Sequence, residues 1–336
     1  MSKKASETRI GINGFGRIGR LLTRVLVKKQ LLHIVAINDP VLDVRSMAYL
    51  LKYDSVHGKF PLDIHIENDH ILKINGCPIQ IFSEIDASNI RWGDVGAEIV
   101  AECSGFYTSA AKSEAHLSAG AKHVVISAPA ENTPVFVMGV NQESYDPHSM
   151  NIISNGSCTT NCLVPLLKVV NDLYGIEECL VTTVHAVTAT QKTVDGGSKK
   201  DPRAGRAYAR NIIPASTGAS KAVTCVLPEL QGKVAALSLR VPVENVSVID
   251  VTAKLTRPMH SKEDLAHHIE QIEHNKQDKL HGILGVTYDP VVSSDFNGDE
   301  RSGILDVEAS VMLNPTFVKL IAYYDNEWAY AVRLVS

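Results

Sequence analysis

Two cysteines stand four residues apart in the stretch SCTTNC, Ser157 to Cys162, and thiols at this spacing allow four interpretations. A zinc site would need two more soft ligands, which the other cysteines and the histidines do not supply at zinc-like spacing. A disulfide between residues one helical turn apart would add little stability. A buried pair and a nucleophile are left. For Cys162, which precedes Leu163 in an apolar run, we expect packing.

Cys158 has a different setting, because it follows the loop NGS and falls in the first turn of a helix expected over about Thr159 to Tyr174. The positive end of the helix dipole and the free backbone N–H groups would lower the pKa of a thiol there. The same N–H groups could hold an oxyanion formed by attack on a carbonyl. From these residues alone, Cys158 is either a nucleophile or a small buried side chain.

A nucleophilic thiol requires a base, and the best candidate is His185, at the end of a β-branched run. Thr188 and Thr190 follow closely, and such small donors suit an oxyanion or a phosphate. Arg240 lies between apolar strand residues, where an unpaired charge would be costly. We therefore expect an anionic partner for it, either a ligand or an internal carboxylate. The stretch PASTG offers another hydroxyl-and-glycine pocket at Thr217-Gly218.

A second group of residues, Gly14-Phe15-Gly16-Arg17-Ile18-Gly19, lies at the junction of an expected strand and an expected helix. Glycines in a G-x-G-x-x-G pattern permit a tight turn and let the backbone approach a pyrophosphate at the helix N-terminus. Asp39 ends the next expected strand, where its carboxylate would accept bonds from a ribose and repel a 2′-phosphate. This favours NAD over NADP. Ser104 and Ser127 follow two further strands and would line the same crevice.

Composition limits the classes of partner. The chain has 336 residues, a net charge of −4 and 45% hydrophobic residues, as is usual for a globular protein that binds small molecules. We expect no nucleic acid and no membrane partner, since clustered Lys and Arg and a run of roughly 20 apolar residues are missing. MSKKASET is followed by no long apolar run, so we expect no signal peptide. Scattered cysteines fit a reducing cytoplasm, and we expect no metal site.

The elements that must position these residues differ between the two halves of the chain. In the first half, short β-branched runs alternate with helical stretches, which predicts a parallel, doubly wound sheet. The stretch DIHIENDHILKINGCPIQIF adds antiparallel hairpins. After Cys158, long β-rich segments with segregated helices predict an α+β arrangement. The expected strands are 9–13, 34–38, 98–103, 123–127, 135–140, 151–154, 179–186, 234–241 and 247–254; the expected helices are 17–29, 159–174 and 262–274; residues 195–210 are expected to be an extended loop.

The predicted fold class is therefore α/β, with a Rossmann-type doubly wound NAD-binding domain and an α+β catalytic domain that contains a mixed antiparallel sheet. We expect the NAD-binding domain over residues 1–155 and the catalytic domain over residues 156–321. The C-terminal segment, residues 322–336, is expected to return to the first domain.

The motifs now define a resemblance. GFGRIG, SNGSCTTNC, HAVTATQKTVDG, NIIPASTG, RVP and YDNEW occur in the order and rough spacing of the phosphorylating glyceraldehyde-3-phosphate dehydrogenases. The chain resembles this family from about Thr8 to its last residue. One such motif alone could mislead, whereas six in register are highly specific.

The resemblance implies a reaction. Cys158 would attack the aldehyde of glyceraldehyde 3-phosphate, with His185 as general base, and hydride would pass to NAD⁺. Inorganic phosphate would then cleave the thioester to 1,3-bisphosphoglycerate. The resemblance also implies binding residues: Thr188, Thr190 and Arg240 for the substrate phosphate; Ser157, Thr159, Thr217, Gly218 and Arg206 for inorganic phosphate; Gly14, Phe15, Gly16, Arg17, Ile18, Gly19, Asp39, Ser104, Ser127 and Asn326 for NAD.

The family further implies a homotetramer, with an S-shaped loop at about residues 187–210 at the subunit interface. Two alternatives remain: an erythrose-4-phosphate dehydrogenase, which releases its acyl group to water, and a non-catalytic NAD-binding or redox-sensing relative. Gly156, Gly197, Pro202 and Ala329 depart from the common family pattern. We expect Gly156 to loosen the turn before the thiol, and Gly197 and Pro202 to affect the S-shaped loop.

Overall fold

The structure is a computed structural model that describes residues 8–30, 33–198 and 201–336. The chain forms two compact units, one of residues 1–136, 144–156 and 331–336 and the other of residues 137–143 and 157–330. The expected boundary at residues 155 and 156 stays a prediction, because compactness alone does not establish that each part folds independently. Among the described helices, none combines the length and the apolar character that crossing a membrane would require.

The first unit is built on an eight-stranded sheet in the order β3-β4-β5-β2-β1-β6-β7-β8. The strands from β5 to β8 run parallel, whereas β3, β4 and β5 pair antiparallel, so the expected hairpins are confirmed. The bounds in this unit are β1 Arg9–Asn13, α1 Arg17–Lys29, β2 His33–Asn38, α2 Val44–Lys52, β3 Ile64–Asn68, β4 Ile71–Ile74, β5 Cys77–Phe82, β6 Ile99–Glu102, α3 Ala110–Ser118, β7 His123–Ile126 and β8 Ile152–Ser154.

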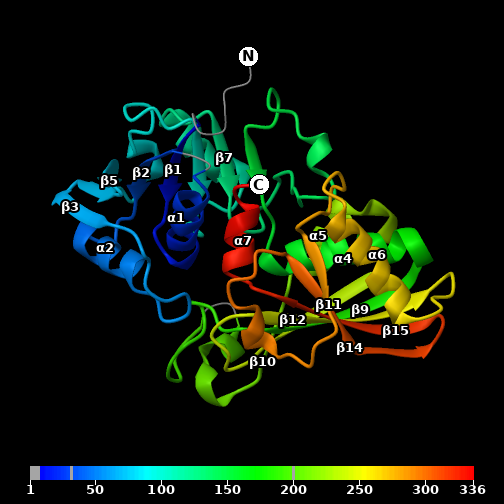
Figure 1. Ribbon diagram of the computed structural model, residues 1–336. Coiled ribbons are helices and arrows are strands. Elements are labelled where there is room, and N and C mark those ends of the chain that lie inside the picture. The colour runs from blue at the N-terminus through cyan, green and yellow to red at the C-terminus, as the bar shows by residue number, and fades with distance from the viewer. Residues whose placement is uncertain (1–7, 31–32, 199–200) are drawn as a thin grey trace. The chain divides into compact units, whose positions relative to one another are not determined.

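Helices cover both faces of this sheet, as a doubly wound fold requires. On one face, α1 and α2 pack side by side over a cluster that includes Ile12, Leu22 and Ile37 (Figure 1). A second cluster, which includes Val35 and Trp92, packs residues of α3 and the neighbouring turns. Because side chains alternate along a strand, apolar residues on both faces make the near-continuous hydrophobic runs seen in the sequence.

One expected strand of this region is wrong. Residues 135–140 form a bridge at Val135 and then a turn in which Val140 N–H donates to Val137 C=O, at 3.0 Å. Residues 137–143 belong to the second unit, where Gly139 lies so close to Leu280 that a Cβ would be 2.5 Å from its side chain. The apolar run is buried by this packing, without adding a strand to the sheet.

The second unit contains a seven-stranded mixed sheet in the order β10-β11-β9-β12-β15-β14-β13. Helices α4, α5 and α6 pack on one face of it (Figure 1), and along β12 every second residue is buried. The bounds are α4 Cys158–Tyr174, β9 Ile176–His185, β10 Ile213–Ala215, α5 Ala219–Val226, β11 Val234–Arg240, β12 Ser247–Leu255, α6 Lys262–His274, β13 Leu284–Thr287, β14 Gly303–Asn314, β15 Phe317–Tyr324 and α7 Trp328–Arg333, which spans the division between the units.

Local signals fix the ends of these helices. Ser261 caps α6 by accepting from Asp264 N–H, while the Asp264 carboxylate accepts from Ser261 N–H, so the expected capping box is present. A cap of this kind stabilises a helix by about 1 kcal/mol. The expected loop at residues 195–210 contains the short 3-10 helices Pro202–Gly205 and Tyr208–Arg210; Lys199 and Lys200 lie outside the described residues.

Candidate active site

Cys158 is the first residue of α4, and the local sequence explains why the helix begins there. Gly156 has φ +66°, a left-handed conformation that glycine adopts without steric cost. Ser157 is the N-cap, and its hydroxyl accepts from Thr160 N–H at 3.0 Å. Cys158 is partly exposed, whereas Cys162, one turn later, is fully buried. The two thiols thus have the different settings that the sequence predicts.

His185, the last residue of β9, is buried beside the thiol. Its Nε2 lies 3.4 Å from Cys158 Sγ, within the distance of a hydrogen bond to sulfur. The parallel pairing of β9 with β11 places Arg240 opposite His185. The Arg240 guanidinium contacts His185 Nδ1 and donates to Ala186 C=O at 3.2 Å. Sheet register therefore brings together a thiol, an imidazole and a cation that are far apart in the sequence.

Burial dominates the electrostatics of this cluster. Burial, followed by the nearby positive charge of Arg240, lowers the pKa of His185 to about 4. Burial also raises the pKa of Cys158, while the charge of Arg240 and the N–H of Thr159 act in the opposite direction. The expected lowering of the thiol pKa is therefore wrong in sign, because desolvation outweighs the helix terminus. At neutral pH the pair consists of a thiol beside a neutral imidazole.

Two neighbours of His185 Nδ1 determine which nitrogen carries the proton. Ala186 C=O, 2.6 Å away, can only accept, so it favours a proton on Nδ1. Nε2 then has a free lone pair directed at Cys158 Sγ. Arg240 can only donate, so its contact favours the opposite tautomer. Moving Arg240 away from Nδ1 would therefore leave the imidazole in the form that accepts a proton from the thiol.

Hydroxyl groups surround this pair. Thr159 is buried, and its hydroxyl bonds to that of Tyr324 at 2.9 Å, while Tyr324 also bonds to Thr183 at 2.8 Å. The Tyr324 ring lies edge-on to His185, with the centroids 6.1 Å apart. Thr159 can thus offer an anion its backbone N–H more readily than its hydroxyl. Sequence reasoning missed Tyr324, although it is the first residue of the quoted motif YDNEW.

The other predicted anion-binding residues lie on three segments. Thr188 and Thr190 follow β9, are exposed, and bond to each other at 2.9 Å. Thr217 and Gly218 precede α5, which packs against α4. Arg206 is exposed and pairs with Asp195 at 3.1 Å. Direct contacts thus join Cys158, His185 and Arg240, whereas Arg206 has a carboxylate partner of its own.

A second hydrogen-bonded chain passes through Ser247 and ends at Asn326. The sequence predicted Asn326 but not its partner Ser247. Ser247 accepts from Ala186 N–H at 3.1 Å and donates to Asn326 Oδ1 at 2.7 Å. The Asn326 amide nitrogen therefore points away from Ser247. Val246, immediately before Ser247, is buried with φ +65°, a strained conformation for a β-branched residue. Such strain costs about 1–3 kcal/mol and is commonly found at functional sites.

The glycine pattern of the first unit forms the turn between β1 and α1. Gly14 has φ +90°, and a Cβ there would lie 2.5 Å from Ser104 N. A Cβ on Gly19 would lie 2.1 Å from Gly14 O, while one on Gly16 would meet open space. No side chain caps α1 at Gly16. Two glycines are thus required for packing, and the third leaves a helix N-terminus open to a pyrophosphate.

Asp39 follows β2 and ties two loops together. Its Oδ2 accepts from Phe15 N–H at 2.8 Å, and its Oδ1 accepts from Val41 N–H at 2.9 Å and Leu42 N–H at 3.1 Å. Oδ2 accepts only one of these bonds, so it still has a lone pair for a ribose hydroxyl. The Phe15 side chain packs in the core, and the Arg17 side chain pairs with Asp54. Both residues would therefore contact a dinucleotide through their backbone groups. Ile18 follows in the first turn of α1, and Ser127 follows β7.

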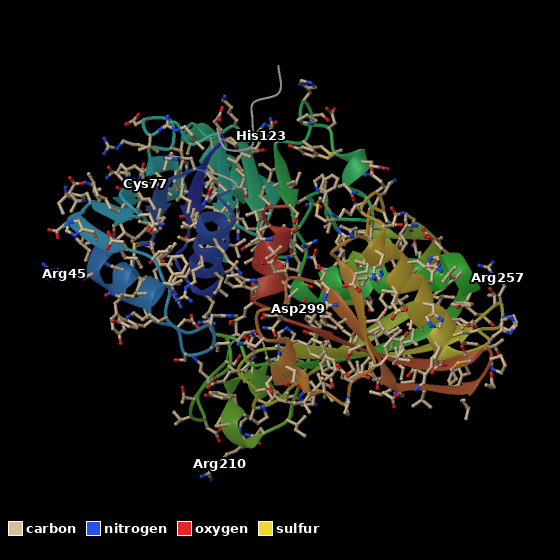
Figure 2. All side chains as sticks on the ribbon, viewed as in Figure 1. Arg45, Cys77, His123, Arg210, Arg257 and Asp299 are labelled. Atoms are coloured by element: carbon tan, nitrogen blue, oxygen red, sulfur yellow. The ribbon has the colours of Figure 1, made fainter. Side chains whose placement is uncertain are left out.

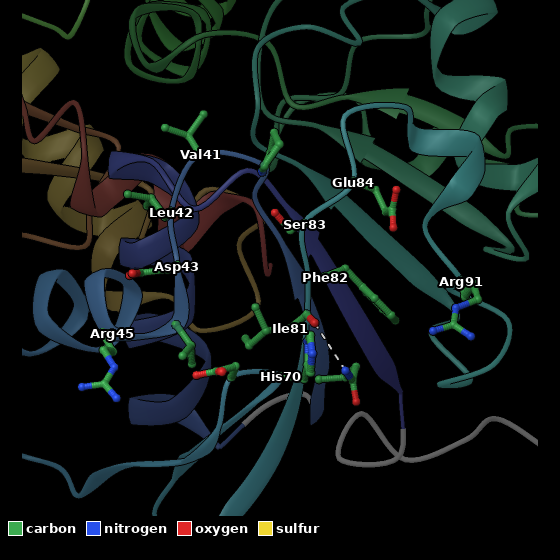
Figure 3. A pocket seen from close by; sticks show the side chains of 14 residues that line it. Val41, Leu42, Asp43, Arg45, His70, Ile81, Phe82, Ser83, Glu84 and Arg91 are labelled. Atoms are coloured by element: carbon green, nitrogen blue, oxygen red, sulfur yellow. Dashed lines mark hydrogen bonds between the residues drawn. The ribbon is translucent and has the colours of Figure 1, made fainter.

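A cavity of about 800 Å³ adjoins this loop (Figure 3). It is lined by the segment from Pro40 to Arg45, by β5 residues from Gln80 to Phe82, and by Arg91. None of the predicted site residues lines it. The predicted site residues therefore lie outside the lining of this cavity.

The cysteines other than Cys158 differ in exposure. Cys77 on β5 is exposed (Figure 2), as is Cys225 on α5, and all six cysteines are free thiols. In the part of the chain that the structure describes, no group of three or more His, Cys, Asp or Glu residues could hold a metal ion.

Comparison with known proteins finds matches for both parts of the chain. Residues 8–110 match the family model described as glyceraldehyde 3-phosphate dehydrogenase, NAD binding domain, and residues 157–326 match the corresponding C-terminal domain. The chain is 52% identical to glyceraldehyde-3-phosphate dehydrogenase 2 of Danio rerio over 331 residues, which cover 98% of this chain and 97% of the relative. It is 50% identical to glyceraldehyde-3-phosphate dehydrogenase 1 of Schizosaccharomyces pombe, covering 98% and 96%. A chloroplastic glyceraldehyde-3-phosphate dehydrogenase of Arabidopsis thaliana is 52% identical, covering 100% and 78%.

Proposed function

Because the chain belongs to the glyceraldehyde 3-phosphate dehydrogenase family, we propose that Cys158 is its nucleophile and His185 its general base. The activity is the NAD-dependent oxidative phosphorylation of glyceraldehyde 3-phosphate. One observation carries the assignment of roles: Cys158 Sγ and His185 Nε2 lie 3.4 Å apart at the start of a helix. A thiol and a neutral base at this distance can exchange a proton directly.

The first step uses the base that burial keeps neutral. His185 Nε2 takes the proton of Cys158, and the thiolate attacks the aldehyde carbon to form a thiohemiacetal. The backbone N–H groups at the start of α4 and the protonated imidazole stabilise the oxyanion. His185 gives this proton to the oxyanion, which becomes the thiohemiacetal hydroxyl, and it takes the proton back as the thioester forms. NAD⁺, when bound, would supply the acceptor for the hydride of the substrate carbon.

Arg240 and the nearby threonines bind the terminal phosphate of the substrate in this proposal. The Arg240 Nε is buried and lacks a partner in the described residues, so an anion would satisfy it. Thr188 and Thr190 add hydroxyl donors. A phosphate that draws Arg240 away from His185 Nδ1 would also favour the tautomer that accepts the thiol proton. Substrate binding and base activation are thereby coupled.

A second anion site, for inorganic phosphate, consists of Ser157, Thr159, Thr217 and Gly218 in this proposal. Support comes from their positions at the starts of α4 and α5, two helices that pack together. Thr159 contributes its backbone N–H, since Tyr324 occupies its hydroxyl. Arg206 joins this site only if it leaves Asp195. Phosphate held here attacks the thioester and releases the acyl phosphate.

For the dinucleotide we propose the segment from Gly14 to Gly19 as the pyrophosphate site and Asp39 as the ribose acceptor, with Ser104 and Ser127 alongside. The close packing of Gly14 and Gly19 and the open space at Gly16 support this role. Asn326 orients the nicotinamide carboxamide, because Ser247 occupies its Oδ1 and leaves its amide nitrogen as a donor.

The decisive experiment follows NADH formation with glyceraldehyde 3-phosphate or erythrose 4-phosphate, each with and without inorganic phosphate. We expect turnover that requires phosphate, and a Cys158→Ser variant whose turnover is lost by more than about 10⁴-fold, since a hydroxyl is a far poorer nucleophile. Cys162→Ser serves as the matched thiol control. Phosphate-independent turnover of erythrose 4-phosphate would favour the hydrolytic alternative. NAD binding without turnover would favour the non-catalytic one.

We also propose a homotetramer. The helix-free face of the second sheet exposes two pairs of large apolar residues, Leu180 and Leu237 on β9 and β11, and Val311 and Phe317 on β14 and β15. Their exposure supports a subunit interface on this face. Sedimentation equilibrium tests the assembly, and a monomer at micromolar concentration would contradict it.

The cytoplasm is our proposed compartment. Among the relatives, one from Chlamydomonas reinhardtii is described as cytosolic and one from Arabidopsis thaliana as chloroplastic, so similarity alone does not decide. Six free cysteines support a reducing environment. Localisation of a fluorescent fusion would test this, and enrichment in another organelle would contradict it.

A further inference from the structure

Glu102, the last residue of β6, is a buried carboxylate that the reaction described above does not use. Its side chain is only 1% exposed, and both oxygens are occupied. Oε1 accepts from Ser104 N–H at 2.6 Å and from the Ser104 hydroxyl at 2.5 Å. Oε2 accepts from Asn13 Nδ2 at 2.6 Å and lies 2.9 Å from His116 Nε2. An acidic side chain buried among partners this close is a strong constraint on the positions of those partners.

The proton on His116 can be placed from its other neighbour. Trp92 Nε1, which can only donate, lies 3.1 Å from His116 Nδ1. Nδ1 must therefore accept, and the ring N–H is on Nε2, directed at Glu102. Both rings are fully buried, so neither can turn to water. Glu102 thus accepts four hydrogen bonds from donors that are held in place.

The hydrogen bonds of Glu102 reach residues next to the glycine turn, Gly14 to Gly19, which is the dinucleotide fingerprint. The Ser104 backbone packs directly on Gly14, where a Cβ would come within 2.6 Å of Ser104 Cα. Asn13, which immediately precedes Gly14, also accepts from Asn38 Nδ2 at 2.8 Å, and Asn38 immediately precedes Asp39. One carboxylate is therefore bonded directly to residues beside the glycine turn, and it is linked to the ribose acceptor through Asn13 and Asn38.

We propose that Glu102 is a positioning residue for the dinucleotide. By holding Ser104 and Asn13, it fixes the Gly14 turn at the pyrophosphate site and, through Asn38, the strand end that presents Asp39. Its effect is indirect: it sets the geometry of the groups that bind NAD, and it is separate from the thiol and base of the second unit.

An amide cannot replace this carboxylate. A Gln side chain at position 102 would direct its NH₂ group either at Ser104 N–H or at Asn13 Nδ2 and His116 Nε2. The Ser104 hydroxyl could rotate and accept, but a backbone N–H cannot. A donor would then face a donor, and either Ser104 or Asn13 must shift away from its place beside Gly14.

The test compares Glu102→Gln with Glu98→Gln. Glu98 lies just before the same strand and forms a surface pair with Lys122 at 2.8 Å, so its substitution is a matched loss of charge outside the network. The dissociation constants of NAD⁺ and ADP-ribose are measured by calorimetry well below the unfolding temperature of each variant. We expect Glu102→Gln to weaken both ligands about 10- to 100-fold, and Glu98→Gln to change them less than about twofold.

Kinetics separate positioning from general destabilisation. In Glu102→Gln we expect a higher KM for NAD⁺ with kcat at saturating NAD⁺ within about threefold of the wild type, because Cys158 and His185 are untouched. A lower unfolding temperature with unchanged dissociation constants would show a purely structural role and overturn the proposal. Weaker NAD⁺ binding with unchanged ADP-ribose binding would also overturn it, since the effect would not pass through the fingerprint. If Glu102→Gln does not fold, the dissociation constants of NAD⁺ and ADP-ribose are measured for His116→Asn, which removes one donor to Glu102. Weaker binding of both ligands would support the proposal, and unchanged binding would overturn it.

Discussion

Two buried histidines, one in each compact unit, have opposite surroundings. His116 lies between a Trp donor and the Glu102 carboxylate, so both ring nitrogens have a partner of the right kind. His185 lies between a thiol, a carbonyl and a guanidinium, and two of these compete for Nδ1. The satisfied histidine fixes one arrangement of its neighbours. The histidine with competing partners can change its proton state, and this is what a base requires.

The most direct test of this difference is to replace each histidine in turn. His185→Asn removes the base, and we expect kcat/KM to fall roughly 10²- to 10⁴-fold, the usual effect of a general base. His116→Asn leaves Trp92 Nε1 or a Glu102 oxygen without its buried partner, and we expect the free energy of unfolding to fall by about 1–3 kcal/mol with kcat at saturating NAD⁺ nearly unchanged. Steady-state kinetics and chemical denaturation of both variants give the measurement. If His185→Asn and His116→Asn both lost stability and had equal activity, the two histidines would not differ in role.

The burial of His185 also predicts in which direction the stability of the protein changes with pH. Burial lowers the pKa of His185 from 6.5 to about 4, so between these values the unfolded chain binds a proton at His185 that the folded chain does not. Its contribution therefore makes the folded state less stable as the pH falls from about 6.5 to about 4. His185→Asn should remove this part of the acid destabilisation. Denaturation midpoints at pH 7 and pH 4.5 check it, and an identical pH dependence in the variant would contradict it.

The sequence predicts the elements and the individual residues better than their contacts. Cys158 at a helix start and His185 at a strand end follow from local patterns, as do the glycine turn and Asp39. The 3.4 Å contact between Sγ and Nε2 depends on packing between α4 and β9, and the position of Arg240 depends on a parallel register between β9 and β11. Such pairings between distant segments are not encoded in any local pattern.

The errors of the sequence reasoning have the same physical origin. The helix terminus predicted a lowered thiol pKa, but burial, which belongs to the folded chain, reverses the sign at Cys158. The apolar run at residues 135–140 predicted a strand but packs as a turn in the second unit. Glu102 could have been found, because an acid in the apolar run IVAEC is as unusual as Arg240 in its strand.

Arg240 gives a smaller test of the contrast between the two histidines. Its charge stabilises the Cys158 thiolate directly and also lowers the pKa of His185. In Arg240→Gln we expect the loss of the direct charge to outweigh the higher basicity of His185, so less thiolate is present at a given pH. We expect iodoacetamide to alkylate Cys158 about 10-fold more slowly at pH 7, because a nearby opposite charge lowers a pKa by about one unit or more. Site-specific rates come from mass spectrometry, since Cys77 and Cys225 are also exposed. The Cys77 rate in the same sample is the internal control, and equal slowing at both thiols would refute a local effect.

The smallest expected effect concerns Gly156, the residue that departs from the family pattern just before the thiol. Its φ of +66° is a conformation that costs an alanine roughly 1–2 kcal/mol, so glycine suits this turn rather than loosening it. Gly156→Ala should lower the free energy of unfolding by about 1 kcal/mol and slow turnover only slightly. Gly197→Ala is the matched control, because a Cβ there meets open space and its φ lies outside the left-handed region. Equal stability of the two variants in urea denaturation would mean that the turn before Cys158 is not held in this conformation.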